Sequence, residues 1–232
     1  MSTGEILKAA LAARRENLGM DECRRIFAEA GIPLNASSFA RTREEALAAG
    51  DRIGYPVVLK IVSPEIVHKT EVGGVRLQIR SREELGAAWD EMMRAVSARV
   101  PGARVDGVTV DEQVSGTELI VGSTRDPQFG PLIMFGLGGI LVEIYRDVTF
   151  RLIPIERADA LEMIEEVRGK QIYRGARGLP RADPDSLVEV LLAVSRLVER
   201  YPAIRELDLN PLVVTAKGLR AIDARILLSV DR

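Results

Sequence analysis

The segment ELDLNPL at residues 206–212 is the sharpest candidate for a metal site in the sequence. Asp208 and Asn210 alternate with leucines, so in a β-strand both polar side chains point to one face. Asp223 follows on the strand that we expect to pair with this one. Carboxylate and amide oxygens are ligands that suit Mg²⁺. A solvated polar stripe is the alternative, but Asp and Asn are poor strand formers, so we favour a metal site.

A lysine interrupts the apolar run VVLKIV at residues 57–62. Burying this charge, that of Lys60, costs free energy unless the ammonium group has a partner. A lysine so placed can contact phosphate as a point charge. It can equally lie on an edge strand, with its stem packed and its head in water. The residues alone leave these two interpretations open.

The only histidine, His68, lies in the polar stretch PEIVHKTEVGG. A lone surface histidine is ordinarily without function. Here Lys69 adds positive charge, and the backbone at Gly73 and Gly74 can approach a phosphate closely. An imidazole can also act as a nucleophile and carry a phosphoryl group. The stretch is therefore a candidate for phosphate chemistry.

Two further segments give weaker signals. The stretch EQVSGTE, residues 112–118, could bind adenine through its backbone and ribose hydroxyls through a carboxylate. It can equally be an exposed turn, which is the interpretation that we favour for this stretch in isolation. The glycines of FGLGGILVE, Gly136, Gly138 and Gly139, match neither a Walker A motif nor GxGxxG before a helix. They indicate either a mobile β-loop over phosphates or a bulge.

Composition excludes several classes of protein. The 232 residues carry a formal net charge of −2, with a sequence pI of about 5.7, which argues against a nucleic-acid binder. A single cysteine and a single histidine exclude an internal disulfide and any multi-Cys or multi-His metal centre. No run reaches the roughly 18 apolar residues of a membrane span, and the start is too charged for a signal peptide. We expect a cytoplasmic protein without a membrane or nucleic-acid partner.

The remaining pattern is that of an α/β protein. Helical spacing and capping residues predict two helices within residues 5–30 and further helices at 42–53, 81–98, 157–168 and 184–201. Strands are predicted at 37–40, 57–62, 75–79 and 107–114, followed by a strand-rich stretch at 118–155. Residues 207–215 and 219–228 are expected to pair as a closing hairpin around Lys217 and Gly218.

The order of these features along the chain resembles the ATP-grasp fold, in which two α/β lobes clamp ATP between their sheets. GYPVVLKIVSPEIVHKTEVGGV, RDPQFGPLIMFGLGGILVEIYRDVTFRL and ELDLNPL look like the β subunit of ADP-forming acetyl-CoA (acyl-CoA) synthetases, relatives of succinyl-CoA synthetase. The resemblance spans nearly the whole chain. We expect an N-terminal helical segment at 1–20, a small lobe at 21–112 and a large lobe at 113–232, with the lobe division placed where the first predicted sheet ends.

This resemblance implies the reversible reaction of acyl-CoA, ADP and phosphate to acid, CoA and ATP. A separate α subunit would bind CoA, select the acyl group and form the acyl phosphate, usually in an α₂β₂ heterotetramer, so this chain should not make acyl-CoA alone. His68 would take the phosphoryl group and carry it on a swinging loop to the nucleotide, ATP or ADP with Mg²⁺.

The resemblance also assigns roles to the other candidates. Lys60 matches the phosphate-contacting lysine, and Asn210 and Asp223 match the Mg²⁺ ligands, with Asp208 beside them. The adenine hinge and ribose carboxylate correspond to Glu112, Gln113, Val114 and Glu118. The loop facing the phosphoryl donor corresponds to residues 136–143 and ends at Glu143, whose role differs among relatives.

Two alternatives remain at this point. An ATP-grasp carboxylate–amine ligase would act through an acyl phosphate and have no use for a histidine in the loop. A non-catalytic, nucleotide-binding regulatory subunit would ordinarily have lost a metal ligand, whereas Lys60, Asn210 and Asp223 are all present.

Overall fold

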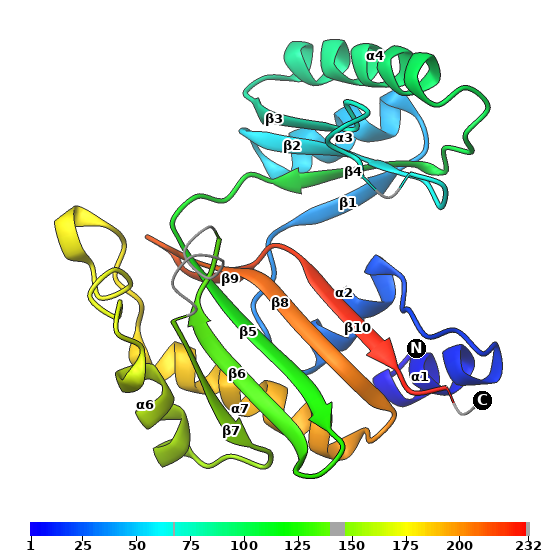
Figure 1. Cartoon of the computed structure of the whole chain (residues 1–232). Coiled ribbons are helices and arrows are strands. Elements are labelled where there is room, and N and C mark those ends of the chain that lie inside the picture. The colour runs from blue at the N-terminus through cyan, green and yellow to red at the C-terminus, as the bar shows by residue number, and fades with distance from the viewer. Residues whose placement is uncertain (67, 140–146, 231–232) are drawn as a thin grey trace. The chain divides into compact units, whose positions relative to one another are not determined.

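The computed structural model describes residues 1–66, 68–139 and 147–230 (Figure 1). The chain divides into two compact units. Unit 2 is the continuous stretch Asn35–Gln113, and unit 1 combines Met1–Leu34 with Val114–Arg232.

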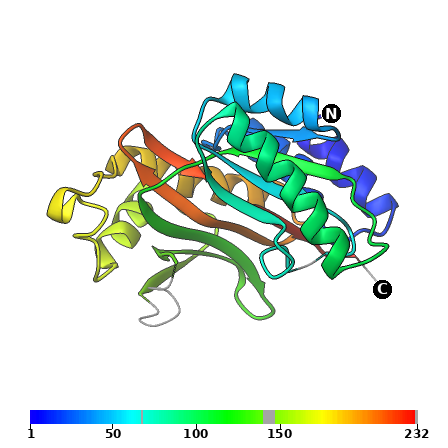
Figure 2. The same ribbon diagram turned by 90° about the horizontal axis from the view of Figure 1, so that it is seen from above.

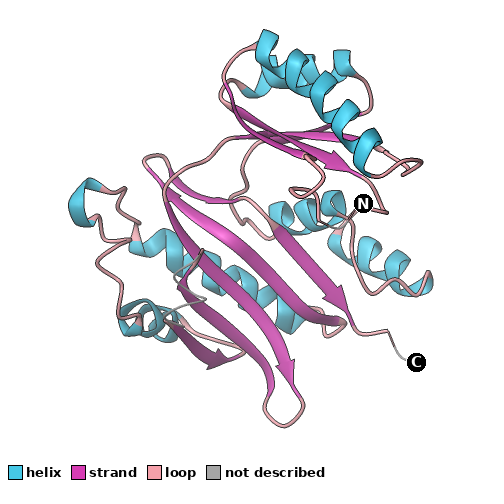
Figure 3. Cartoon of the chain, turned by 45° about the horizontal axis from the view of Figure 1, so that its top comes forward, coloured by secondary structure: helices cyan, strands magenta, loops and turns pink. Residues whose placement is uncertain are grey.

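Unit 2 is a four-stranded antiparallel sheet with two helices on one face. Its elements are β1 (Ser37–Ala40), α3 (Arg43–Ile53), β2 (Val57–Val62), β3 (Val75–Ile79), α4 (Arg82–Arg99) and β4 (Gly107–Glu112). The strand order is β1-β4-β2-β3. Figures 2 and 3 show α3 and α4 next to each other over this sheet. Both helices begin at predicted caps, because Thr42 and Ser81 accept hydrogen bonds from backbone amides three residues ahead.

Alternate residues of the unit 2 strands form the core beneath the helices. Leu59 and Ile61 of β2, with Val108 and Val110 of β4, are completely buried in this core. Residues between them in sequence point to the opposite face of the sheet, because successive strand side chains alternate. Lys60 is one of these, so the register of β2 and β4 decides what it can reach.

Unit 1 is built on a six-stranded sheet in the order β10-β8-β5-β6-β7, with β9 also paired to β8. Within the described residues, the neighbouring strands of this sheet all run antiparallel. Its helices are α1 (Thr3–Ala12), α2 (Met20–Glu29), α6 (Arg157–Glu166), the short 3₁₀ helix η1 (Ala176–Gly178) and α7 (Pro184–Arg200). Its strands are β5 (Thr117–Asp126), β6 (Gly130–Leu137), β7 (Val148–Leu152), β8 (Ile204–Thr215), β9 (Gly218–Ala221) and β10 (Ala224–Leu228).

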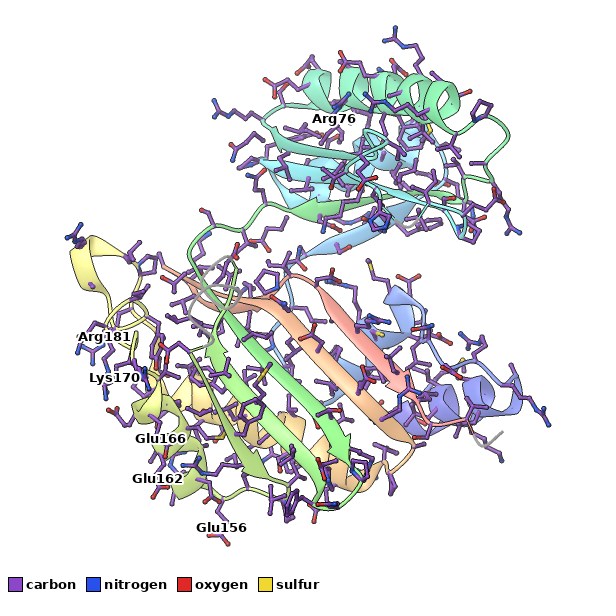
Figure 4. The ribbon with its side chains drawn as sticks, in the orientation of Figure 1. Arg76, Glu156, Glu162, Glu166, Lys170 and Arg181 are labelled. Atoms are coloured by element: carbon purple, nitrogen blue, oxygen red, sulfur yellow. The ribbon has the colours of Figure 1, made fainter. Side chains whose placement is uncertain are left out.

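One hydrophobic core joins these helices to the sheet. Helix α7 contributes an apolar face that packs on β5 and β6, and α6 packs on β7 (Figure 1). On the solvent side, Arg151 forms ion pairs with Glu162 and Glu166 of α6. Figure 4 labels these two glutamates, together with Lys170 and Arg181 on the segment that follows. Exposed pairs of this kind contribute little stability, so the apolar contacts hold α6 in place.

The compact units differ from the predicted lobes at the N-terminus. The small lobe was expected to begin at residue 21, yet residues 1–34 group with the C-terminal part of the chain. Phe27 of α2 is fully buried in the unit 1 core. Leu34 forms an isolated bridge with Ala221, and Leu18 donates a hydrogen bond to Ile226. These contacts link residues about 200 positions apart, beyond the reach of local patterning.

The closing hairpin also differs from its prediction. The turn at Lys217 and Gly218 exists, but the second arm is interrupted, so β8 pairs first with β9 and then with β10. Asp223 lies in the break, where its carboxylate accepts a hydrogen bond from the Ala224 amide. Among the described residues, no helix has the length and apolar character that crossing a membrane requires.

The buried thiol of Cys23 gives a test of the α2 packing. The side chain is 1% exposed, and burial raises the pKa of the Cys23 thiol to about 11. Since the thiolate is the reactive form, we expect the native chain at pH 8 to react with a disulfide reagent at less than about one tenth of the unfolded chain's rate. The measurement is thiol release with and without guanidinium. Equal rates would show that α2 is not packed with this side chain buried in the core.

Candidate functional site

In unit 2, the predicted strand lysine lies inside the sheet. Lys60 belongs to β2, which has neighbours on both sides, so the edge-strand alternative is wrong. Its Nζ lies 3.1 Å from Oδ2 of Asp111, and the lysine side chain is 22% exposed. The ammonium group is thus compensated by a carboxylate and still reaches the surface.

Asp111 is a residue that our sequence analysis missed. It is 4% exposed and is held by hydroxyl groups as well as by the lysine. Ser37 Oγ donates to Asp111 Oδ1 at 2.5 Å, and Thr109 Oγ1 donates to Oδ2 at 3.4 Å. The available signal was the alternation of GVTVDE, which places Thr109 and Asp111 opposite the buried valines.

The His68 loop follows β2. The histidine side chain is 77% exposed, and its Nδ1 lies 4.0 Å from Glu71 Oε1. The loop closes on itself, since Gly74 donates to the Lys69 carbonyl at 2.7 Å and the Ile61 amide donates to Gly74. Backbone hydrogen bonds therefore hold the end of the loop, and the imidazole is exposed to solvent.

The local backbone and packing explain why both of these positions in the loop are glycine. Gly73 has φ +74°, a left-handed conformation that favours glycine. A Cβ on Gly74 would lie 2.5 Å from Ile61 Cγ2, which is closer than packing allows. Their proposed approach to phosphate remains a prediction, since turn geometry already accounts for glycine at both positions.

The predicted adenine hinge begins with two side chains that bind backbone groups of unit 2. Glu112 Oε2 accepts from the Ala36 amide at 3.0 Å, and Gln113 Oε1 accepts from the Gln78 amide at 2.6 Å. Gln78 is a non-glycine residue with φ 60°, so the Gln113 bond supports a strained backbone. These bonds fix the end of β4, and Val114 begins the second segment of unit 1. Adenine binding by this stretch stays a prediction.

In unit 1, the structure brings two predicted features together. The Gly138 amide donates to the Glu118 carbonyl at 2.8 Å. A Cβ on Gly139, whose φ is +61°, would lie 2.5 Å from Glu118 Oε2. Gly136 faces the Asp147 carbonyl, which would lie 2.3 Å from an added Cβ. The glycine turn thus packs on the predicted ribose carboxylate; Glu143, at the end of the predicted loop, lies outside the described residues.

The three predicted metal ligands line one cavity of about 380 Å³. Asp208 and Asn210 lie on the face of β8 opposite the core, as their alternation predicted. Asp223 reaches the same cavity from the break between β9 and β10, rather than from a strand. The cavity is also lined by Leu18, Met20, Ala224 and Arg225.

The electrostatics of this cavity fit a divalent cation. Burial, followed by the nearby charge of Asp223, raises the pKa of Asp208, while Arg225 opposes the shift. The two carboxylates repel each other, and together with the neutral amide they form an oxygen donor set that suits Mg²⁺. Among the described residues, no group of three or more His, Cys, Asp or Glu side chains is arranged to hold a metal ion, so this cavity, with two carboxylates and an amide, relies on the ligand for further oxygen donors. Bound there with nucleotide, Mg²⁺ would neutralise phosphate charge.

Arg225 is a second residue that our sequence analysis missed. It pairs directly with Asp208 across β10 and β8 and lines the metal cavity. It also lines an adjoining apolar groove of about 280 Å³ on the same sheet face, which includes Met134 and Phe150. Its position two residues after Asp223 was the available signal.

Comparisons with known proteins identify the family of this chain. Residues 9–228 match the family model described as ATP-grasp domain. The chain is 43% identical over 225 residues to Acetate--CoA ligase [ADP-forming] I subunit beta of Pyrococcus furiosus, with 97% of both chains covered. It is 47% identical to Acetate--CoA ligase [ADP-forming] I of Archaeoglobus fulgidus over 87% of this chain, but spans only 29% of that protein's length.

A solved structure gives a similar result. Acetyl-coenzyme A synthetase 1 of Ca. Korarchaeum cryptofilum, in complex with coenzyme A and Ca-AMPCP, aligns with a TM-score of 0.90 and 41% identity, covering 98% of this chain and 100% of that chain. A second structure of that protein contains coenzyme A and Mg-AMPPCP, with a phosphohistidine segment pointing towards the nucleotide binding site. Its TM-score is 0.85 at 39% identity, with the same coverage.

The cavity assignment predicts that Asp223→Ala weakens Mg²⁺-dependent nucleotide binding. Removing this carboxylate takes away one oxygen donor and one negative charge, so we expect the Mg²⁺ concentration for half-maximal ADP binding to rise about tenfold or more. Titration of Mg²⁺ at fixed ADP by calorimetry measures this. Asp185→Ala, which removes an exposed α7 carboxylate, is the matched control. An unchanged Mg²⁺ requirement in Asp223→Ala would rule out this ligand.

Proposed function

Because this chain belongs to the ATP-grasp family, among the β subunits of ADP-forming acetate–CoA ligases, we propose that it is the nucleotide-binding subunit of an ADP-forming acyl-CoA synthetase. The overall reaction converts acyl-CoA, ADP and phosphate into acid, CoA and ATP. The observation that carries the proposal is the position of the only histidine, which is exposed on a loop whose ends are held by backbone hydrogen bonds. This is the arrangement that a phosphoryl carrier requires.

His68 acts as the carrier in this proposal. In this proposal the proton is on Nδ1, the nitrogen that lies 4.0 Å from the Glu71 carboxylate, and Nε2 provides the lone pair for phosphorus. In the ATP-forming direction, the Nε2–P bond of the phosphohistidine breaks and a β-phosphate oxygen of ADP forms the new P–O bond. The imidazole leaves neutral, with its proton still on Nδ1. The exposed side chain lets the same group meet a donor elsewhere.

The remaining residues position and neutralise the phosphates. Phosphoryl transfer depends mainly on alignment and charge compensation, which a fixed ammonium group supplies directly. Lys60 is that group in unit 2. Asp208, Asn210 and Asp223 would hold the nucleotide's Mg²⁺. The glycine turn at Gly138 and Gly139 supports Glu118, which would bind ribose.

The acyl chemistry belongs to a partner in this proposal. The Archaeoglobus relative is more than three times as long as the matched segment, whereas the Pyrococcus relative is a separate β subunit of nearly equal length. We therefore assign CoA binding and acyl phosphate formation to an α subunit, in an α₂β₂ assembly in the cytoplasm. Nucleotide binding stays with this chain.

Replacing the carrier separates turnover from nucleotide binding. We expect His68→Asn to lower kcat of the reconstituted complex by about 10³-fold or more, because asparagine has no nucleophilic nitrogen. The dissociation constant for Mg·ADP should stay within about twofold, since binding uses other residues. Coupled ATP formation and calorimetry provide the two measurements. Glu65→Gln, which changes an exposed carboxylate of the same loop, is the control. Substantial turnover by His68→Asn would instead support direct transfer to the nucleotide.

A further inference from the structure

We propose that Asp111 is a positioning residue that holds the ammonium group of Lys60 in place for the nucleotide phosphates. This inference rests on the proposed function, which gives Lys60 its phosphate role. Asp111 itself would touch no substrate: its side chain is 5% exposed and acts through the lysine. The carboxylate would fix the flexible Lys60 side chain in one position.

The strand register places the two residues together. Lys60 of β2 is directly opposite Thr109 of β4, and Asp111 is two residues further along β4 on the same face. This diagonal spacing is within the reach of a lysine side chain, and Nζ lies 3.1 Å from Oδ2. The pair is therefore set by the antiparallel pairing of two central strands.

Asp111 is itself held from a third strand. Ser37 of β1 is directly opposite Asp111 of β4, and its hydroxyl group donates to Oδ1 at 2.5 Å. Thr109 Oγ1 adds a longer contact to Oδ2 at 3.4 Å, the oxygen that also faces Lys60. Both carboxylate oxygens thus have partners, and the carboxylate is a fixed acceptor rather than a mobile surface charge.

The chemistry of lysine makes such a fixed acceptor useful. An ammonium group has three N–H donors on a flexible four-carbon stem. One donor used on Asp111 restricts the stem and leaves two for phosphate oxygens. Because the Lys60 side chain remains 22% exposed, those donors are accessible to a ligand. The carboxylate also compensates the ammonium charge when the site holds no phosphate.

The test measures binding of Mg·ADP and of adenosine to the purified full chain by calorimetry. Asp111→Asn keeps the size of the side chain and removes its charge. We expect its dissociation constant for Mg·ADP to rise about tenfold, with adenosine binding unchanged, because only phosphate contacts depend on Lys60. Asp106→Asn, which alters a partly exposed acid paired with Arg104 in the same unit, is the matched control and should change neither constant.

A double-mutant comparison separates positioning from a merely structural ion pair. Lys60→Met should weaken Mg·ADP binding at least as much as Asp111→Asn, and the double variant should be no weaker than Lys60→Met alone. If the two effects multiply, or if Asp111→Asn weakens adenosine and Mg·ADP equally, Asp111 does not work through Lys60 and the inference fails.

The outcomes also distinguish the inference from the proposed function. Unchanged Mg·ADP binding in Lys60→Met would remove Lys60 from the phosphate site. If Lys60→Met weakens Mg·ADP binding and Asp111→Asn leaves it unchanged, only the positioning role is overturned. Should Asp111→Asn fail to fold, Ser37→Ala keeps both charges and removes one support of the carboxylate. We then expect a two- to threefold loss of Mg·ADP affinity with adenosine unchanged, and no loss would contradict the inference.

Discussion

The alternation of side chains along half-buried strands is the constraint on which the candidate site depends. In β2 and β4, the residues that build the unit 2 core are those next to Lys60 and Asp111 in sequence. In β8, leucines on either side of Asp208 build the unit 1 core. A slip of one residue in either sheet would bury the charged groups and expose the apolar ones. The hydrophobic core therefore fixes which functional side chains face a ligand.

Each unit carries charged groups of a kind that can bind phosphate, directly or through a cation. Unit 2 contributes an ammonium group held by a buried carboxylate, and unit 1 contributes two carboxylates and an amide around a cavity. A phosphate chain binds the ammonium group directly and the carboxylates only through a cation. An acidic cluster and a basic residue are thus each compatible with a phosphate ligand, the first through a cation and the second directly. Burial, and after it the neighbouring carboxylate of Asp223, raises the pKa of Asp208 in this cavity.

Local sequence patterns predicted the parts of the site that depend on one strand or one turn. The alternation at Asp208 and Asn210 and the strand position of Lys60 are of this kind. Asp111 was missed because its importance depends on pairing with two other strands, which no local period reveals. The break at Asp223 and the grouping of residues 1–34 with unit 1 likewise depend on distant contacts. The resemblance to a family supplied roles that the residues alone left open.

The central claim is that His68 carries a phosphoryl group between a partner subunit and the nucleotide. The direct measurement incubates the full chain and its α subunit with Mg²⁺ and γ-labelled ATP, followed by mapping of acid-labile, base-stable phosphate. We expect label on His68, and we expect that label to be lost when the carboxylic acid substrate and CoA are added. Mg²⁺-dependent nucleotide binding without label at His68 would contradict it and favour direct transfer.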